Sequence, residues 1–342
     1  MSANHDFEVK SGDIPPSEPP PNSRGLLGFV LHVIATYGLL VFGVLLTLAF
    51  VVLLPGSFAG MQTVRAILGN NTTVALLSMA EMLVIACGNY DLSVGFSIGL
   101  MHIIAMSLLA WVGVPWPLVV VITIAAGGLV GLINGVLVEY AKIDSFIATL
   151  GVGSILYGFS TFITNGTQVV GNVPEPFALI NDGRVLGLPF PTYIVVLIAV
   201  MAWIGLEHLP VGRQLYAIGS NRRAAELTGV RSRRLVMGSF IASGLIVGLA
   251  GVILAARLQV AQASVGQEFL LPSFVGALLG ATTVRPGRVN AAGTIIAVLV
   301  LAVGIAGLQQ LGNSFFVEPI FQGLALIISV GLAGYAARRR KA

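Results

Sequence analysis

The sequence predicts an all-α integral membrane protein of about ten transmembrane helices, with both ends of the chain in the cytoplasm. Composition is the first reason. Of the 342 residues, 56% are hydrophobic and only 9% are charged, and the mean hydropathy is +0.95, which excludes an ordinary soluble domain. The second reason is the recurrence of apolar stretches long enough to cross a bilayer. The third is that Lys and Arg gather in alternate connections between these stretches.

Apolar stretches of roughly 17 to 25 residues mark the expected spans. The clear ones cover residues 31–54, 72–88, 93–112, 117–139, 191–207, 235–256, 290–311 and 315–336. Two weaker stretches bring the expected number to ten. Residues 144–164 are rich in Gly, Ser and Thr, and residues 269–284 are short and contain a proline and two glycines.

The basic residues give the orientation independently, because Lys and Arg concentrate in cytoplasmic loops. With the amino terminus inside, 15 of the 18 basic residues fall in the cytoplasm, and only Arg65, Arg184 and Arg257 fall outside. An odd number of spans would reverse the second half of the chain and remove this asymmetry. The cytoplasmic set is Lys10, Arg24, Lys142, Arg213, Arg222, Arg223, Arg231, Arg233, Arg234, Arg285, Arg288, Arg338, Arg339, Arg340 and Lys341.

Both ends of the chain are expected to be cytoplasmic tails that flank one transmembrane domain of residues 28–336. Residues 1–27 contain the Pro-rich run "DIPPSEPPPNS" and cannot bury a core, so they should be disordered. Residues 337–342 form a basic tail. The first apolar stretch is too long for a signal peptide and lacks a small-residue cleavage site, so we expect an uncleaved anchor.

Charge and cysteine content exclude further classes of protein. The net charge of +4 could suit nucleic acid, but these are the charges that the orientation rule requires beside a membrane, so no nucleic-acid partner is expected. Cys87 alone cannot form an intramolecular disulfide or a Cys-based metal cluster, and four scattered histidines add no ligand spacing. No nucleophile motif is present either, so neither a metal site nor a membrane enzyme is expected.

Glycines spaced four residues apart predict close helix packing. Gly127, Gly131 and Gly135 lie on one face of the fourth expected span, and Gly244 and Gly248 lie in a later span. Small residues at this spacing let helix backbones approach closely in lipid. The likeness of the two stretches, "AAGGLVGLINGVLVEY" and "SGLIVGLAGVILAA", suggests an internal duplication.

The longest polar interruption, residues 208–234, lies in the cytoplasm in this topology and contains six arginines. Its middle, from Asn221 through "RRAAEL" to Gly229, predicts a short helix with an Asn N-cap and a closing Gly that can adopt a left-handed conformation. Such a helix can be a segment that a partner protein binds, or a basic segment that only fixes the topology. Composition alone leaves both interpretations open.

The order of these segments resembles the permease subunits of bacterial ABC importers for ribose, xylose, arabinose and related sugars. The likeness runs from about residue 70 to the carboxyl end. It rests on "YDLSVG" at 90–95, "GLINGVLVEYAKIDSFIATLG" at 131–151, "ITNGTQV" at 163–169, "VGRQLYAIGSNRRAAELTGV" at 211–230 and "GLAGVILAARLQVAQASVGQ" farther on. Each match is modest, but their order and spacing make the assignment specific.

The resemblance implies that the cytoplasmic loop contains the coupling helix that docks on the ATP-hydrolysing subunit. Two alanines would permit close approach, while the flanking charges would pair with charges at the rim of the partner. The interpretation as a partner-binding helix is therefore favoured over the topological one. The expected coupling residues are Arg213, Asn221, Arg222, Ala224, Ala225, Glu226 and Gly229.

ATP hydrolysis is expected in a separate subunit. A P-loop needs Gly-Lys-Ser/Thr, and the only lysine followed by a hydroxyl residue, Lys10, is preceded by Val9. We therefore expect a non-catalytic chain that binds no cofactor, with ATP and Mg²⁺ on the ATPase. The resemblance further implies a periplasmic sugar-binding protein, a second permease copy in a homodimer, and a location in the bacterial inner membrane.

Four polar residues are candidates for the translocation pathway: Glu81, Asp91, Ser93 and Asn134. Asp91 can cap the third helix or contact the sugar, and capping is favoured. Glu81 falls near the middle of the second span, where ionisable residues usually face a cavity, although a protonated Glu that joins two helices is an equal alternative. Asn134 can bond the solute or a neighbouring helix.

The expected function is import of a monosaccharide, a pentose or a hexose, by alternating access. An ABC permease for a nucleoside or a branched-chain amino acid is an alternative, although an amino acid would want a positive charge inside a span. A secondary transporter, with Glu81 and Asp91 as coupling carboxylates, is another. The family commonly has Gly-Gly-Thr-Ser before a Gly-rich turn, whereas residues 278–290 read "LLGATTVRPGRVN", which leaves the contacts of the inner gate open.

Overall fold

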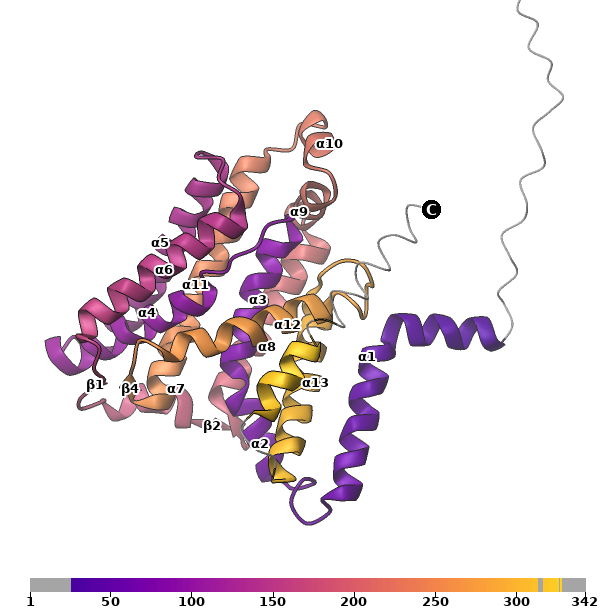
Figure 1. Ribbon diagram of the computed structural model, residues 1–342, viewed down its shortest axis with the longest axis horizontal. Helices are drawn as coiled ribbons and strands as arrows, with labels where there is room; N and C mark the ends of the chain where they lie inside the picture. Colours follow the sequence, from indigo (N-terminus) through magenta and orange to yellow (C-terminus); the bar gives the residue numbers. More distant parts are fainter. Residues whose placement is uncertain (1–25, 313–315, 326, 328–342) are drawn as a thin grey trace, which may run out of the picture.

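The computed structural model describes residues 26–312, 316–325 and 327, and there the chain is a bundle of helices with short strands at its edge (Figure 1). The α-helices are α1 (Leu26–Leu53), α2 (Met61–Asn70), α3 (Thr72–Ala86), α4 (Val94–Ser107), α5 (Trp116–Glu139), α6 (Ser145–Thr164), α7 (Glu175–Asp182), α8 (Phe190–Trp203), α9 (Pro210–Ser220), α10 (Arg222–Leu227), α11 (Ser232–Leu258), α12 (Leu270–Gly280) and α13 (Ala291–Gln310). Short π- or 3₁₀-helical turns extend three of them: η1 (Leu108–Val112), η2 (Ile204–His208) and η3 (Val265–Phe269).

The strands form two small antiparallel pairs. β1 (Val169–Val170) pairs with β4 (Val260–Ala261), and so joins the segment after α6 to the segment after α11. β2 (Arg184–Val185) and β3 (Leu188–Pro189) form a hairpin. Its two connecting residues, Leu186 and Gly187, both have positive φ, which is the backbone of the turn type that matches the twist of a two-residue hairpin.

The described part of the chain accounts for seven helices long and apolar enough to cross a membrane. α2 and α3 form an eighth span if their bend of 43° is a break within one span. The expected span at 269–284 is observed as the shorter apolar helix Val265–Gly280, and half of the one at 315–336 lies outside the described residues. An all-α membrane protein is therefore confirmed, while ten spans and two cytoplasmic ends stay predictions. The two expected tails also lie outside the described residues, apart from the start of α1 at Leu26.

Capping residues and prolines set the ends of several helices. Asp144 is the N-cap of α6 and accepts hydrogen bonds from the amides of Phe146 and Ile147. Asn290 does the same for α13, where its Oδ1 lies 2.8 Å from the amide of Gly293. These caps satisfy amides that have no partner within the helix. Proline in the first turn, where its missing donor costs nothing, begins α5, α7, α8 and α9.

The glycines selected from the sequence lie where α5 crosses α11. A Cβ atom on Gly127 would come within 2.3 Å of the carbonyl oxygen of Gly244, and one on Gly131 within 2.1 Å of that of Phe240. A Cβ atom on Gly248 would lie 2.7 Å from the backbone of Ile124 on α5, and one on Gly135 would lie 3.2 Å from Met237. Only glycine permits such a distance between the two backbones, so this crossing fixes how the two halves of the bundle pack.

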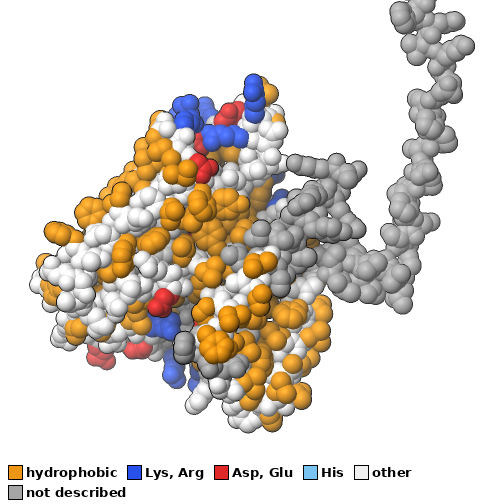
Figure 2. Space-filling model, in the orientation of Figure 1, with side chains coloured by type: hydrophobic (Ala, Val, Ile, Leu, Met, Phe, Trp, Pro, Cys, Tyr) orange, Lys and Arg blue, Asp and Glu red, His pale blue; other side chains and the backbone are white. Residues whose placement is uncertain are grey.

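The two ends of the bundle differ in character. α9 and α10 lie at one end, and α2, α7 and the strands lie at the opposite end (Figure 1). Lys and Arg side chains gather at the α10 end, with a smaller group at the other end and hydrophobic side chains on the flank between them (Figure 2). This pattern agrees with a bundle that spans a membrane with its ends in water.

Candidate functional site

The helix at the exposed tip of the bundle is α10. Asn221 is its N-cap, and the side-chain oxygen of this residue accepts a hydrogen bond from the amide of Ala224 at 3.1 Å. After the helix, Gly229 has a φ of +86°, which an L-residue rarely adopts. The short capped helix that the sequence predicts is therefore confirmed. The Asn cap defines where α10 begins, and the left-handed Gly turns the chain after its end.

The exposed surface of α10 contains two apolar side chains beside charged ones. Ala224 is exposed, and Leu227 has 83% of its surface exposed. Arg223 and Glu226 are exposed on the same helix. Ala225 is only 5% exposed and packs in the core of its own chain. Of the two alanines, therefore, only Ala224 is open to solvent, and Ala225 packs the helix against the bundle.

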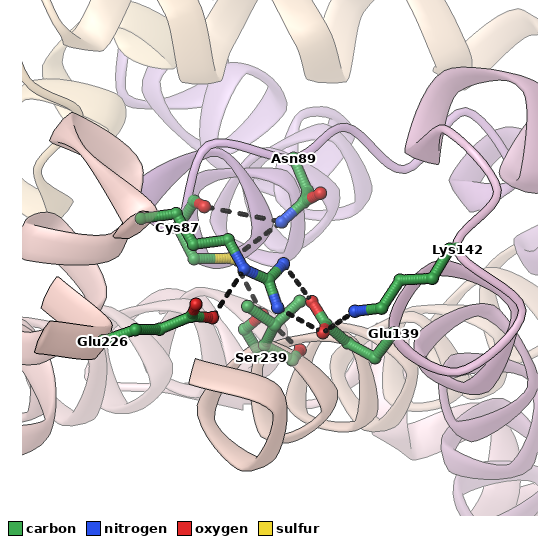
Figure 3. Close-up of polar contacts among 8 residues, drawn as sticks. Cys87, Asn89, Glu139, Lys142, Glu226 and Ser239 are labelled. Atoms are coloured by element: carbon green, nitrogen blue, oxygen red, sulfur yellow. Dashed lines mark hydrogen bonds and ion pairs between the residues drawn. The ribbon is translucent and has the colours of Figure 1, made fainter. Parts of the chain in front are cut away.

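Arg222 binds within the chain rather than standing free for a partner. Its Nη1 and Nη2 donate to Oε1 and Oε2 of Glu139 at 2.7 and 2.5 Å, and its Nε donates to Glu226 at 3.1 Å. The side chain of Glu139, at the end of α5, is completely buried, and Lys142 adds a weaker contact at 3.5 Å. Figure 3 shows Glu139, Lys142 and Glu226 with their polar groups turned toward one another. The hydrogen bonds to Glu139 raise the pKa of Arg222 further above its usual range.

This two-fold bond anchors α10 to α5, because a fork of two parallel N–H···O bonds fixes orientation as well as distance. The remaining expected coupling residues are exposed: Arg213 on α9, Glu226 on α10 and Gly229 behind it. Arg222 therefore fixes the position of α10 against α5, and its guanidinium is not free to bind a partner.

A second ion-pair cluster joins η2 and α9 to the turn between α12 and α13. Glu207, whose side chain is 5% exposed, accepts from Arg285 and, at 2.7 Å, from Arg288. The guanidinium of Arg288 lies 4.0 Å above the ring of Tyr216, whose hydroxyl donates to the carbonyl of Val289 at 2.8 Å. The basic turn therefore packs against η2 through charge and against α9 through stacking.

Three of the four pathway candidates form one buried network. Oδ1 of Asp91 accepts from the amide and the hydroxyl of Ser93, at 3.1 and 2.6 Å, and from Nδ2 of Asn134 at 3.2 Å. Asn134 also donates to the Ser93 hydroxyl at 2.8 Å. These bonds end at Ser93, the residue before α4, and at Asn134 on α5, and none of them reaches an amide of the helix that begins at Val94. Burial raises the pKa of Asp91 to about 6, while the bonds from Ser93 and Asn134 lower it.

The fourth candidate, Glu81, stands apart from this network. It lies fully buried in α3, and neither carboxylate oxygen makes a hydrogen bond of normal geometry with the described residues. The hydroxyl of Ser78, one turn earlier, is also without a partner there. Glu81 is close enough to Asp91 for an electrostatic interaction. Among the described residues, hydrogen bonds join Asp91, Ser93 and Asn134, but none joins Glu81 to them.

At least three cavities lie in the described part of the chain, and none of these three is lined by the four residues. One of about 520 Å³ is almost wholly apolar and lies between α2, α3, α8 and α13. One of about 480 Å³ lies between α2, the β2–β3 hairpin and the end of α11. One of about 630 Å³ is lined by both polar and apolar residues of α2, α11, η3, α13 and the segment beyond it.

Sequence reasoning missed Leu227, Glu139 and Glu207. Leu227 follows "RRAAE" and looks like an ordinary core leucine, and only the placement of α10 shows that it is exposed. Glu139 could have been noticed as an acidic residue at the end of an apolar span. Its partner, however, is 83 residues away along the chain, a separation that a single sequence does not reveal.

The described bundle, with seven helices long and apolar enough to cross a membrane, is that of a multi-pass membrane protein. The chain belongs to the family described as "Branched-chain amino acid transport system / permease component", whose model matches residues 63–330. The resemblance to permeases of bacterial ABC sugar importers is confirmed by the relatives, and with it the location in the bacterial inner membrane.

Three relatives illustrate the similarity. The ribose import permease protein RbsC of Haemophilus influenzae is 29% identical over 299 residues, which cover 86% of this chain and 92% of that protein. The protein of the same name from Escherichia coli K12 is 31% identical, covering 84% and 90%. The autoinducer 2 import system permease protein LsrD of E. coli SMS-3-5 is 30% identical, covering 75% and 79%. No solved structure matches the chain.

Proposed function

We propose that this chain is the membrane-spanning subunit of an ABC importer that moves a monosaccharide, a pentose or a hexose, across the inner membrane. The observation that carries the proposal is the similarity to ribose import permeases over 84–86% of the chain. The chain would work as a homodimer and would itself hydrolyse no ATP. A separate ATPase would bind ATP and Mg²⁺, and a periplasmic sugar-binding protein would deliver the sugar.

The geometry of α10 supports the coupling step. The exposed side chains of Leu227 and Ala224 at the tip of the bundle can enter a groove on the ATPase. The two hydrogen bonds between Arg222 and Glu139 would transmit a movement of α10 to α5, and the close glycine contacts would transmit it from α5 to α11. In this mechanism ATP binding closes the ATPase pair, pulls on α10 and changes the side of the membrane to which the path opens.

The test is uptake into proteoliposomes that contain the permease, its candidate ATPase and its candidate sugar-binding protein. We expect ATP hydrolysis and uptake to be stimulated by one loaded binding protein out of a panel of pentoses and hexoses. A double variant, Ala224→Arg with Leu227→Asp, should keep the fold but lose stimulation, because both side chains are on the outer face of α10.

The matched control is Leu186→Asp, which alters the most exposed leucine of the β2–β3 turn, at 93% exposure, on the opposite end of the bundle. This variant should leave the ATPase contact intact. Uptake that ignores ATP and follows a proton or sodium gradient would overturn the importer proposal. Stimulation only by a branched-chain amino acid or a nucleoside would keep the ATP-driven mechanism and replace the cargo.

A further inference from the structure

The almost wholly apolar cavity of about 520 Å³ opens on the flank of the bundle. It lies between α2, α3, α8 and α13, and α8 packs directly against α13 (Figure 1). Four large side chains of its lining are 38–55% exposed: Val196, Val200, Trp203 and Leu299. Its volume falls in the range of about 300–1,000 Å³ that small-molecule sites occupy. In a membrane, this groove faces the acyl chains of the lipid.

The groove is elongated along α8. Its lining extends on this helix from Thr192 to Trp203, a length of about 16 Å at about 1.5 Å per residue. The hydrocarbon core of a bilayer is about 30 Å thick, so the groove is about as long as one leaflet is deep. A lipid acyl chain that lies along α8 fits this length.

One end of the groove leads directly to a group of charged side chains. Trp203 is the last residue of α8, and Ala291 is the first residue of α13, and both line the groove. η2, which continues α8, contains Glu207, and the turn before α13 contains Arg285 and Arg288. The ion pairs of Glu207 with both arginines bring the two segments together beyond the end of the groove.

This charged group has an excess of positive charge. Both guanidiniums bind one oxygen of one carboxylate, Oε2 of Glu207. The side chain of Glu207 is almost fully buried, whereas those of Arg285 and Arg288 are 50% and 37% exposed. The charge that is accessible from outside is therefore that of the arginines. Guanidinium groups offer paired donors in one plane, which suit the oxygens of a phosphate.

Trp203 places this end of the groove at the level of the lipid headgroups. Its ring lies 4.4 Å from that of His208, in an edge-on arrangement. Trp is enriched where a bilayer meets water, because its ring has an apolar body and a polar N–H group. An acyl chain in the groove would thus leave its headgroup on the side of the two arginines.

We infer that this groove binds one anionic phospholipid, with an acyl chain along α8 and the phosphate at Arg285 and Arg288. The apolar groove and the basic group at its end match the two parts of one such molecule. A zwitterionic lipid would fill the groove but would gain less from the arginines. The bound lipid would join η2 to the turn before α13 from outside, beside the ion pairs of Glu207 that already connect them.

The experiment is native mass spectrometry of the full chain in detergent, which measures the fraction of chains that retain phosphatidylglycerol or phosphatidylcholine as each lipid is titrated. Arg285→Gln should weaken phosphatidylglycerol binding about fivefold, the effect of one basic residue beside an anionic lipid, and should leave phosphatidylcholine binding unchanged. Arg223→Gln is the matched control, because Arg223 is exposed on α10 and does not line the groove. It should bind both lipids as the unaltered chain does.

A second pair of variants tests the acyl-chain part of the site. Val196→Trp fills the groove and should weaken the binding of both lipids at least fivefold. Val121→Trp is its control, because Val121 is exposed to a similar degree on α5 and does not line the groove. This variant should leave both affinities unchanged.

Equal phosphatidylglycerol affinity of Arg285→Gln and Arg223→Gln would overturn the inference, and so would equal affinities of the two tryptophan variants. Displacement of phosphatidylglycerol by glycerol 3-phosphate at similar concentrations would also overturn it, because a free phosphate would then be the ligand. The same mass spectra report the number of chains in each particle. Loss of a dimer in Val196→Trp alone would identify the groove as a contact with a second copy of the chain, and would reject the lipid site.

Discussion

The guanidinium of Arg222 on α10 and the buried carboxylate of Glu139 at the end of α5 form a two-fold hydrogen-bonded ion pair, with N···O distances of 2.7 and 2.5 Å. This pair is the most direct polar link between the exposed helix α10 and a membrane-spanning helix in the described chain. Because Glu139 is completely buried, the pair cannot be exchanged for water without a large cost. α10 and α5 should therefore move as one body.

We predict that Arg222→Gln destabilises the fold by about 2 kcal/mol. Loss of one partner of a fully buried pair costs roughly 3–5 kcal/mol, and the value here is lower because Arg222 is 35% exposed. Thermal unfolding can be followed with a thiol-reactive dye, since Cys87 is the single cysteine of the chain and is buried. Because the Cys87 thiol is buried in the folded protein, the dye should react only after unfolding.

Arg223→Gln is the matched control for this prediction. Arg223 is the next residue on the same helix, is exposed, and forms no ion pair within the described residues. Its removal should leave the melting temperature unchanged. Replacement of both partners, Arg222→Met with Glu139→Leu, should recover most of the lost stability. Equal melting temperatures for Arg222→Gln and Arg223→Gln would show that the pair contributes nothing.

The cluster around Glu207 gives a second prediction. Glu207→Gln leaves Arg285 and Arg288 without their carboxylate, and we expect a loss of about 1–3 kcal/mol. Arg285→Gln should cost less, because Arg288 still pairs with Glu207 and stacks on Tyr216. The dye assay ranks the two variants. A larger loss for Arg285→Gln than for Glu207→Gln would mean that the carboxylate is not the centre of this cluster.

The crossing of α5 and α11 gives a third prediction. Gly131→Ala would place a Cβ atom 2.1 Å from the carbonyl oxygen of Phe240, and a backbone atom cannot move aside as a flexible side chain can. We expect a loss of about 3 kcal/mol, at the upper end of the range for overpacking. Gly158→Ala on α6 is the control, because nothing lies within 4 Å of its Cβ position. That variant should gain about 0.5–1 kcal/mol from helix propensity. Similar melting temperatures for both variants would contradict the close crossing.

The sequence predicts the elements whose signal is local. Apolar length predicts the seven helices of the described chain that are long enough to cross a membrane, and the Asn and Gly around "RRAAEL" predict α10 together with both of its ends. The spacing of small residues predicts which faces of α5 and α11 approach closely. These features depend on neighbours within a turn or two of helix, so one sequence contains the information.

Pairings between distant residues could not be predicted in the same way. Arg222 lies 83 residues from Glu139, and Arg285 lies 78 from Glu207, and neither separation follows from a period. The burial of Ala225 beside the exposed Ala224 depends on the angle at which α10 lies on the bundle. The arginines outside the membrane were identified by topology, but only the fold shows that they line one cavity.

A fourth prediction concerns Asp91 and decides between its two interpretations. Its Oδ1 atom accepts three hydrogen bonds, from Ser93 N, Ser93 Oγ and Asn134 Nδ2. The amide oxygen of Asn at this position can accept the same three, so Asp91→Asn should keep the fold within about 1 kcal/mol. Asp91→Ala leaves these buried donors without an acceptor and should cost about 2–3 kcal/mol.

Sugar uptake in proteoliposomes then separates structure from transport. If the carboxylate only joins the start of α4 to α5, Asp91→Asn should transport at nearly the normal rate, since Asn134 and Ser93 keep their acceptor. Loss of uptake by a variant that unfolds normally and still assembles with the ATPase would show that the charge itself acts in the path. In that case the electrostatic interaction between Asp91 and the buried Glu81 would contribute to transport, and Glu81→Gln should reproduce the loss of uptake.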